Sequence, residues 1–168
     1  MFSGISPLIW VHFITAMVAL PLGLWQLLAA KGTPVHRQMG RIYIPVMLVC
    51  LVSALVTFRP GTQFLFFYIL AIVGLASLAS GMGNLRRWLQ AGNPKHLRAH
   101  KIDMGFSWLG LFMAAVSQVL VNPRFGISDF AIGWRYWATF AAINSVIYAI
   151  GWWWIFTRLA PAERPAER

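Results

Sequence analysis

The sequence is poor in acidic residues and in charged residues of either sign. Only 4 of its 168 residues are Asp or Glu and 11% are charged, whereas 59% are hydrophobic. Because soluble domains carry about 25% charged residues, this composition excludes an ordinary water-exposed globular fold. The single cysteine, Cys50, lies in an apolar run, which excludes a disulfide within this sequence and a cysteine metal cluster.

Apolar runs of membrane-spanning length fill most of the chain. Crossing about 30 Å of hydrocarbon takes about 20 mostly apolar helical residues. Five segments meet this condition, at 7–30, 41–58, 64–83, 104–121 and 132–156. The first is too long for the core of a cleavable signal peptide, so we expect it to be retained. The sequence therefore predicts an all-α membrane bundle of five transmembrane helices, forming a single domain over residues 1–168.

Basic residues are divided unequally between the two sides of this predicted bundle. Eleven lie on one side: Lys31, Arg37, Arg41, Arg86, Arg87, Lys95, Arg98, Lys101, Arg158, Arg164 and Arg168. The other side has only Arg59, Arg124 and Arg135. Because cytoplasmic loops retain Lys and Arg during insertion, we expect the N-terminus outside and the basic side, with a short tail at 159–168, in the cytoplasm. Topology thus explains the net charge of +10, and the expected partners are membrane lipids rather than nucleic acid. The predicted location is a bacterial inner membrane.

Three of the four histidines lie on the basic side. His96 and His100 are four residues apart, so they share one helix face if the helix opened by Asn93-Pro94 continues into the fourth span. His36 lies in the first turn of the helix that enters the second span. Both spans run from inside to outside, so the three imidazoles are expected at one depth.

A faint internal repeat has an offset of 60 residues. It pairs Thr33-Pro34-Val35-His36 with Asn93-Pro94-Lys95-His96, and Arg41 with Lys101. A Thr or Asn followed by Pro is a typical helix start. The match suggests two similar helical hairpins.

The histidine cluster has three interpretations. It could hold a b-type haem or another metal between His36 and His96 or His100. It could bind the anionic headgroup of a lipid, or it could be a solvated basic interface. In the haem interpretation, the haem propionates are neutralised by Arg37, Arg41, Arg98 and Lys101.

The fourth histidine, His12, is expected about 20 Å from the others along the membrane normal, so it cannot ligate the same iron. We expect it to hydrogen-bond to Gln118 or Asn122, and a metal-ligand role is less favoured.

The other interior positions lack ionisable groups, which counts against an ion-coupled transporter. No hydrolase or phosphate-binding pattern appears. Enzymatic activity is uncertain and is not required by the sequence.

Two segments resemble a known family. They are similar to the bacterial membrane-protein family named domain of unknown function 2306, which has no settled activity. The two segments are WVHFITAMVALPLGLWQLLAAKGTPVHRQMGRIYIPVM and, later, HKIDMGFSWLGLFMAA. The matching positions are His12, Lys31, Gly32, His36, Arg37, Gly40, Arg41, His100 and Met104. His96 is outside the family pattern, so the resemblance favours His36 with His100. Its histidines at span ends also look like those of small membrane cytochromes, a likeness of fold only.

Together these features predict a small accessory protein of a membrane redox system. Haem b would bind near the cytoplasmic face, ligated by His36 and His100 and surrounded by Arg37, Arg41 and Lys101. One alternative is a structural or assembly subunit of a larger complex or homo-oligomer. Its contact surfaces would be the small-residue face of the third span and the aromatic fifth span. Within the bundle, we expect Gly105 and Gly110 of the fourth span to oppose the small residues of the third span. The other alternative is a lipid- or quinone-binding membrane protein.

Overall fold

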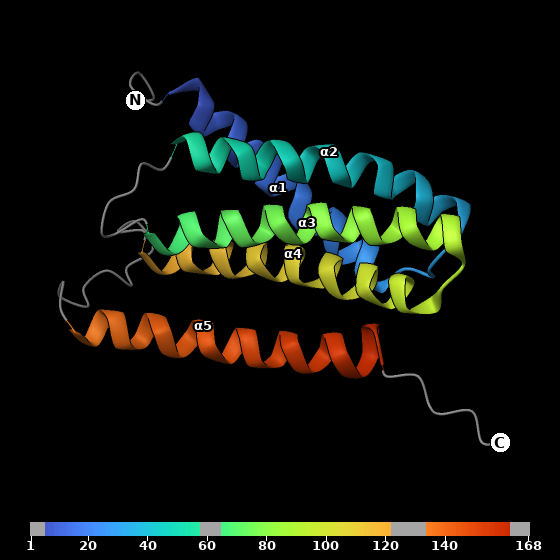
Figure 1. The fold of residues 1–168 in the computed structure, drawn as a ribbon. Helices are drawn as coiled ribbons and strands as arrows, with labels where there is room; N and C mark the ends of the chain where they lie inside the picture. The colour runs from blue at the N-terminus through green and yellow to red at the C-terminus, as the bar shows by residue number, and fades with distance from the viewer. Residues whose placement is uncertain (1–5, 58–64, 122–133, 162–168) are drawn as a thin grey trace.

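The chain folds into five long helices. The structure, a computed structural model, describes residues 6–57, 65–121 and 134–161. The helices are α1 (Pro7–Leu28), α2 (Pro34–Thr57), α3 (Leu65–Ala91), α4 (Pro94–Val121) and α5 (Trp134–Trp154), followed by a π-helical turn, η3 (Ile155–Leu159). All five are long and apolar enough to cross a membrane. In Figure 1, α2, α3, α4 and α5 run in roughly the same direction, whereas α1 crosses behind them at a slant. The predicted all-α bundle of five membrane-spanning helices is confirmed.

The turns before α2 and α4 have the same construction. Gly32 and Gly92 adopt positive φ angles of 77° and 65°. After the first glycine, Thr33 Oγ1 accepts a hydrogen bond from the backbone N–H of His36 at 3.1 Å. After the second, Asn93 Oδ1 accepts one from the N–H of Lys95 at 3.0 Å. Each capped turn starts a helix at the following proline, as the 60-residue repeat predicts.

The helices extend past the predicted spans at the basic side. α3 continues to Ala91 rather than 83, and α4 starts at Pro94 rather than 104. A helix satisfies its own backbone hydrogen bonds, so polar residues can continue it beyond the apolar region. Leu159 and Ala160 are buried, so the tail expected from 159 starts after them. The predicted span ends at 58, 64 and 132, together with Arg59, Asn122, Arg124 and the tail from 162, lie outside the described residues.

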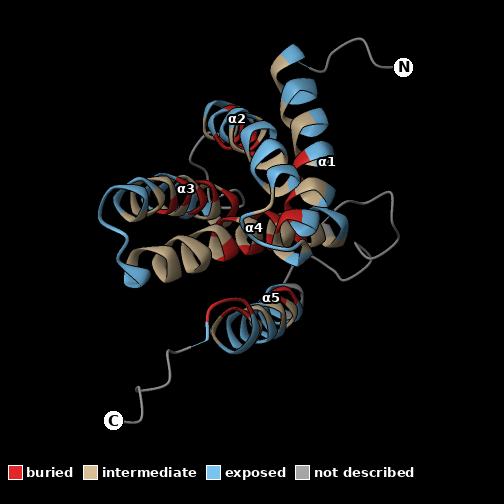
Figure 2. Ribbon diagram, turned by 90° about the vertical axis from the view of Figure 1, so that its right-hand side faces the viewer, coloured by how far each residue is buried: buried red, intermediate tan, exposed pale blue. Residues whose placement is uncertain are grey.

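The helices pack as two hairpins, α1–α2 and α3–α4, with α5 against α4 (Figure 2). Buried residues lie mainly where the helices face one another, and exposed residues lie on their outward sides, as expected for helices whose outer surface meets lipid (Figure 2). The main core comprises Ala19, Tyr43, Met47, Cys50, Leu51, Ala54, Ala71, Leu78 and Leu111. A smaller core joins α4 to η3 through Leu109, Met113, Ile155 and Leu159.

Glycines set the closest helix contacts. Gly81 of α3 faces α4, as predicted: a Cβ there would lie 3.0 Å from Met104 Sδ. The expectation that Gly105 opposes α3 is wrong. A Cβ on Gly105 would lie 2.9 Å from Ile155 and 3.0 Å from Leu159. The missing side chain of Gly105 therefore lets η3 pack closely against α4. A Cβ on Gly110 would have the carbonyl oxygen of Leu70 on α3 as its nearest neighbour, at 3.9 Å.

Candidate ligand-binding pocket at the basic end

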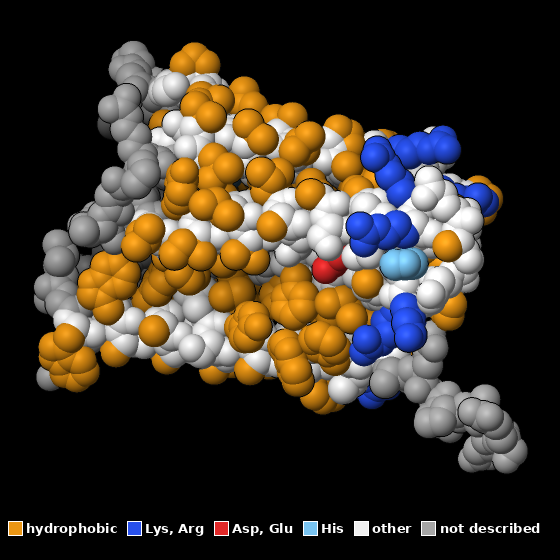
Figure 3. Space-filling model, in the orientation of Figure 1, with side chains coloured by type: hydrophobic (Ala, Val, Ile, Leu, Met, Phe, Trp, Pro, Cys, Tyr) orange, Lys and Arg blue, Asp and Glu red, His pale blue; other side chains and the backbone are white. Residues whose placement is uncertain are grey.

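On the face shown in Figure 3, lysines and arginines gather at one end of the bundle, and hydrophobic side chains are spread over the rest of its length. This basic end contains the turns at Gly32 and Gly92 and the C-terminal end of α5. Its described cations are Lys31, Arg37, Arg41, Arg86, Arg87, Lys95, Arg98, Lys101 and Arg158. The predicted grouping of these basic residues therefore exists in three dimensions.

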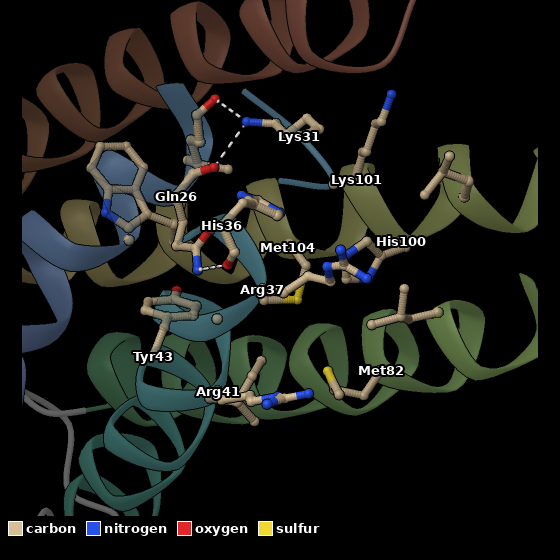
Figure 4. Close-up of a pocket in the computed structure, with 18 of the residues that line it drawn as sticks. Gln26, Lys31, His36, Arg37, Arg41, Tyr43, Met82, His100, Lys101 and Met104 are labelled. Carbon is tan, nitrogen blue, oxygen red and sulfur yellow. Dashed lines mark hydrogen bonds between the residues drawn. The ribbon is translucent and has the colours of Figure 1, made fainter. Parts of the chain in front are cut away.

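A pocket of about 840 Å³ opens between the two hairpins at this end. Its wall is mostly apolar, with side chains such as Leu27, Ile44, Leu85 and Leu97. The residues predicted to hold a cofactor all line it: His36, Arg37, Arg41, His100 and Lys101 (Figure 4). The structure thus brings together side chains from α2 and α4 that are about 60 positions apart in the sequence.

His100 is held in a defined orientation on α4. Its Nδ1 is 2.8 Å from the carbonyl oxygen of Gly81 on α3. A carbonyl can only accept, so Nδ1 carries the proton and Nε2 carries the lone pair in the neutral ring. A histidine that donates one N–H to a backbone carbonyl is the usual arrangement for a metal ligand. His100 is therefore preset to ligate through Nε2.

The close approach of α3 and α4 at this point depends on the neighbours of Gly81. Ser80 Oγ donates to Asp103 Oδ2 at 2.7 Å, and Asn84 Nδ2 donates to the same oxygen at 2.9 Å. Asp103 lies one turn after His100 on α4. These two hydrogen bonds join the helices beside the Gly81 carbonyl and so help to position the imidazole.

His36 is placed by the start of α2 and by α1. Its carbonyl oxygen accepts a hydrogen bond from Gln26 Nε2 at 2.9 Å, and its own Nδ1 is buried with no hydrogen-bond partner. Gly40, one turn further along α2, leaves room for this amide, because a Cβ there would be 3.1 Å from Gln26 Nε2. His36 thus lines the pocket, and its buried Nδ1 has no hydrogen-bond partner.

The pocket is electropositive. Four of its lining residues are cations and none of them is Asp or Glu. Lys31 already has partners, since its Nζ donates to the carbonyl oxygens of Gln26 at 2.8 Å, Leu27 at 2.6 Å and Ala29 at 3.1 Å. These bonds cap the C-terminal end of α1. Burial and the nearby charge of Lys101 lower the pKa of Lys31. The surroundings therefore disfavour further positive charge and favour an anion.

The remaining two histidines lie away from the pocket. His96 is not among its lining residues, although it occupies the position equivalent to His36 in the repeat. His12 Nδ1 is 3.0 Å from the Cys50 carbonyl oxygen of α2. At 1.5 Å per residue, Cys50 is about 21 Å along α2 from His36, which agrees with the predicted isolation of His12. Gln118, one of its predicted partners, has an exposed side chain.

A metal site built from three clustered histidines is not formed. Within the described segments, no group of three or more His, Cys, Asp or Glu side chains could hold a metal ion. A haem takes only two axial ligands from protein side chains, so His36 and His100 together are sufficient for that cofactor.

Several lining residues have no counterpart in the sequence prediction. Gln26 and Tyr43 are buried polar residues at the inner end of the pocket, and Met82 and Trp108 complete its wall. The only sequence signal for Gln26 is that it is a lone amide near the end of an apolar span. An interfacial tyrosine or tryptophan is common in membrane proteins and carries no such signal.

Searches of known protein families, curated proteins and solved structures find no match for this chain. The resemblance in the KGTPVHRQMGR stretch therefore stays a prediction, and the function has to be argued from the pocket itself.

Proposed function

We propose that this membrane protein binds haem b at its basic end and serves as an accessory electron carrier in a membrane redox system. His36 and His100 would be the axial ligands, with the propionates among Arg37, Arg41 and Lys101. The proposal depends on one observation: two imidazoles and three cations, contributed by α2 and α4, line a single apolar cavity.

The pocket suits this cofactor in size and in chemistry. Ligand sites typically measure about 300–1,000 Å³ and are mostly apolar with a few placed polar groups, and this pocket of about 840 Å³ is of that kind. Haem is a flat apolar ring with two carboxylates at one edge. The apolar wall between the helices matches the ring, and the cationic lining matches the carboxylates.

The protein side chains would orient the cofactor and tune its surroundings. The Gly81 carbonyl fixes the ring plane and tautomer of His100, and the cations compensate two negative charges that would otherwise be costly at the edge of a membrane. When bound, haem supplies one-electron transfer. We further propose that the basic end faces the cytoplasm of a bacterial inner membrane. Eight Lys and Arg side chains lie at this end in addition to Lys31, and loops rich in Lys and Arg stay in the cytoplasm during insertion.

The first test is the absorption spectrum of the purified protein. The wild type is expected to show Soret and α bands on reduction. His36→Ala and His100→Ala should each lose most of the bound haem, because each removes an axial ligand. His96→Ala is the matched control: it removes an imidazole one turn from His100 that does not line the pocket, and its spectrum should be unchanged.

Two results would contradict the proposal. One is a wild-type protein, purified from cells supplied with haem, that has neither absorption band nor iron. The other is normal haem content in both His36→Ala and His100→Ala. If phospholipid but no iron co-purifies and is lost on changing Arg37 and Arg41 to Gln, the pocket is instead a lipid headgroup site.

A further inference from the structure

The basic end carries more cations than its pocket and its fold use. Of the nine described there, four line the pocket, and Arg98 donates to the Pro161 carbonyl oxygen at 3.2 Å. The other four are exposed and make no side-chain hydrogen bond or ion pair with the described residues: Arg86, Arg87, Lys95 and Arg158. The only described carboxylate, Asp103, already accepts from Ser80 and Asn84. This end therefore presents positive charge that no described residue compensates.

Three of these cations lie beside an exposed leucine where α3 turns into α4. Leu89 is 69% exposed. Arg86 is three residues before Leu89 on α3, so the two share a helix face, and Arg87 follows Arg86. Lys95 is in the first turn of α4, just after the two residues that connect the helices. We call Arg86, Arg87, Leu89 and Lys95 the hairpin tip.

The hairpin tip extends past the lipid tails. Leu89 is six residues after 83, the predicted end of the third apolar span, which corresponds to about 9 Å along a helix. One headgroup layer is about 5–8 Å thick, half the difference between a whole bilayer and its hydrocarbon core. Leu89 therefore lies on the aqueous side of the headgroups, where lipid tails do not cover it. Retention of Lys and Arg in the cytoplasm explains the cations but not this exposed leucine.

The hairpin tip is continuous with the mouth of the pocket. Leu89 is one of the lining residues, together with Arg37, Arg41 and Lys101. Those three cations are the proposed partners of the haem propionates. A protein seated on the hairpin tip would therefore lie beside the propionate edge of the proposed haem.

We propose that the hairpin tip is the docking surface of an acidic, water-soluble electron-transfer protein. A negative surface complements the uncompensated cations, which would also steer its approach. An apolar centre with a polar rim is the usual anatomy of a protein–protein contact, and arginine is enriched in such contacts. Anionic headgroups match the cations but offer no apolar surface to Leu89. The electron-transfer role of the partner rests on the proposed haem site, whereas the docking surface does not.

Photo-cross-linking in cells that express the protein natively tests this proposal. The photoreactive residue p-benzoylphenylalanine replaces Leu89 or, as the control, Leu65, which is 51% exposed at the opposite end of α3. The Leu89 position should yield an adduct with an acidic, soluble protein that carries a flavin, a haem or an iron–sulfur cluster. The Leu65 position should not yield this adduct. Changing both Arg86 and Arg87 to Glu should abolish it.

Association of the captured protein with the purified full-length chain, held in phosphatidylcholine nanodiscs, gives the magnitude. Arg86→Glu combined with Arg87→Glu should lower the association rate constant roughly tenfold at low salt, because two attractive charges become repulsive. Arg86→Lys combined with Arg87→Lys is the matched control, which keeps both charges and should stay within about twofold of the wild type. Leu89→Ser should speed dissociation without changing the salt dependence of association. These side chains are exposed, so unfolding in graded SDS should not change.

A Leu89 adduct with lipid alone, or the absence of any protein adduct, would overturn the docking surface. The same holds for a captured protein that is not acidic or has no redox cofactor, and for an unchanged association rate after charge reversal of Arg86 and Arg87. Haem and iron content recorded on the same samples keeps the two proposals distinct. A chain that contains haem but captures no partner refutes only the docking surface. A chain that captures an acidic redox protein but has no iron refutes only the haem proposal.

Discussion

Gly81 is the residue on which the geometry of the proposed ligand His100 most depends. Its carbonyl accepts the Nδ1–H of His100, and its missing side chain lets α4 approach. A Cβ at this position would be 3.0 Å from Met104 Sδ and 3.2 Å from Asp103 Cβ. Met104 is a flexible side chain at the edge of the pocket, but Asp103 cannot move freely because it is hydrogen-bonded to Ser80 and Asn84 of α3.

We therefore expect Gly81→Ala to destabilise the bundle by about 1–3 kcal/mol, as overpacking does. It should also lower haem occupancy, because separating the helices lengthens the bond that orients His100. Gly83→Ala is the control on the same helix, where a Cβ would meet nothing within 4 Å. It should be neutral or stabilise by about 0.5–1 kcal/mol. Unfolding in graded SDS measures both, and equal stability of the two variants would contradict the close-contact argument.

At the scale of helices, the two proline-led turns explain why α2 and α4 begin at matching positions. Gly32 and Gly92 have open space around them, so only their positive φ angles require glycine. Each turn brings a histidine-bearing helix back toward the pocket. The turn before α2 also places Lys31, which caps α1.

Gly32→Ala should accordingly cost about 1–2 kcal/mol, the penalty for a Cβ in a left-handed conformation. The informative comparison is again Gly83→Ala, which adds the same methyl group in open space at an ordinary helical φ. If both variants unfold at the same SDS fraction, the turn does not depend on its positive φ. Circular dichroism on both proteins checks that helix content is retained.

Helical periodicity predicted the depth of the histidines but not which way each one faces. Spacing placed His36, His96 and His100 near one level of the bundle, and the pocket includes only the first and the last. The repeat alone would have matched His36 with His96. The choice depends on how α4 is rotated against α3, and Gly81 and Asp103 determine that rotation through contacts between helices.

The polar residues at the inner end of the pocket could not be predicted from the sequence either, because their positions also depend on contacts between helices. Gln26 and Tyr43 belong to apolar runs whose other members pack against lipid or helices. Their burial, and the lack of a partner for Gln26 Oε1, become apparent only once α1 and α2 are packed together. The number of membrane-spanning helices could be predicted from the lengths of the apolar runs, because the thickness of the lipid bilayer sets the length of every spanning helix. No comparable rule predicts the hydrogen-bond partners of a single buried amide.

At the scale of the whole molecule, charge is separated along the bundle axis. The basic end contains every described Lys and Arg whose side chain is placed, and hydrophobic side chains are spread between the two ends on the face shown in Figure 3. Such a charge distribution orients a protein during insertion. It also puts the pocket, its cations and both capped turns on one side of the membrane.

Cysteine labelling can test this orientation, because the only native cysteine, Cys50, is buried. Val35 and Lys95 are exposed residues at equivalent positions of the two turns, so Val35→Cys and Lys95→Cys should behave alike. Both should resist a membrane-impermeant maleimide in intact spheroplasts and react after lysis, since the basic end is expected in the cytoplasm. Leu65→Cys, exposed at the opposite end of α3, should react in intact spheroplasts. Labelling of only one of the first two variants would place the hairpin turns on opposite faces, and a pocket shared by His36 and His100 would then be impossible.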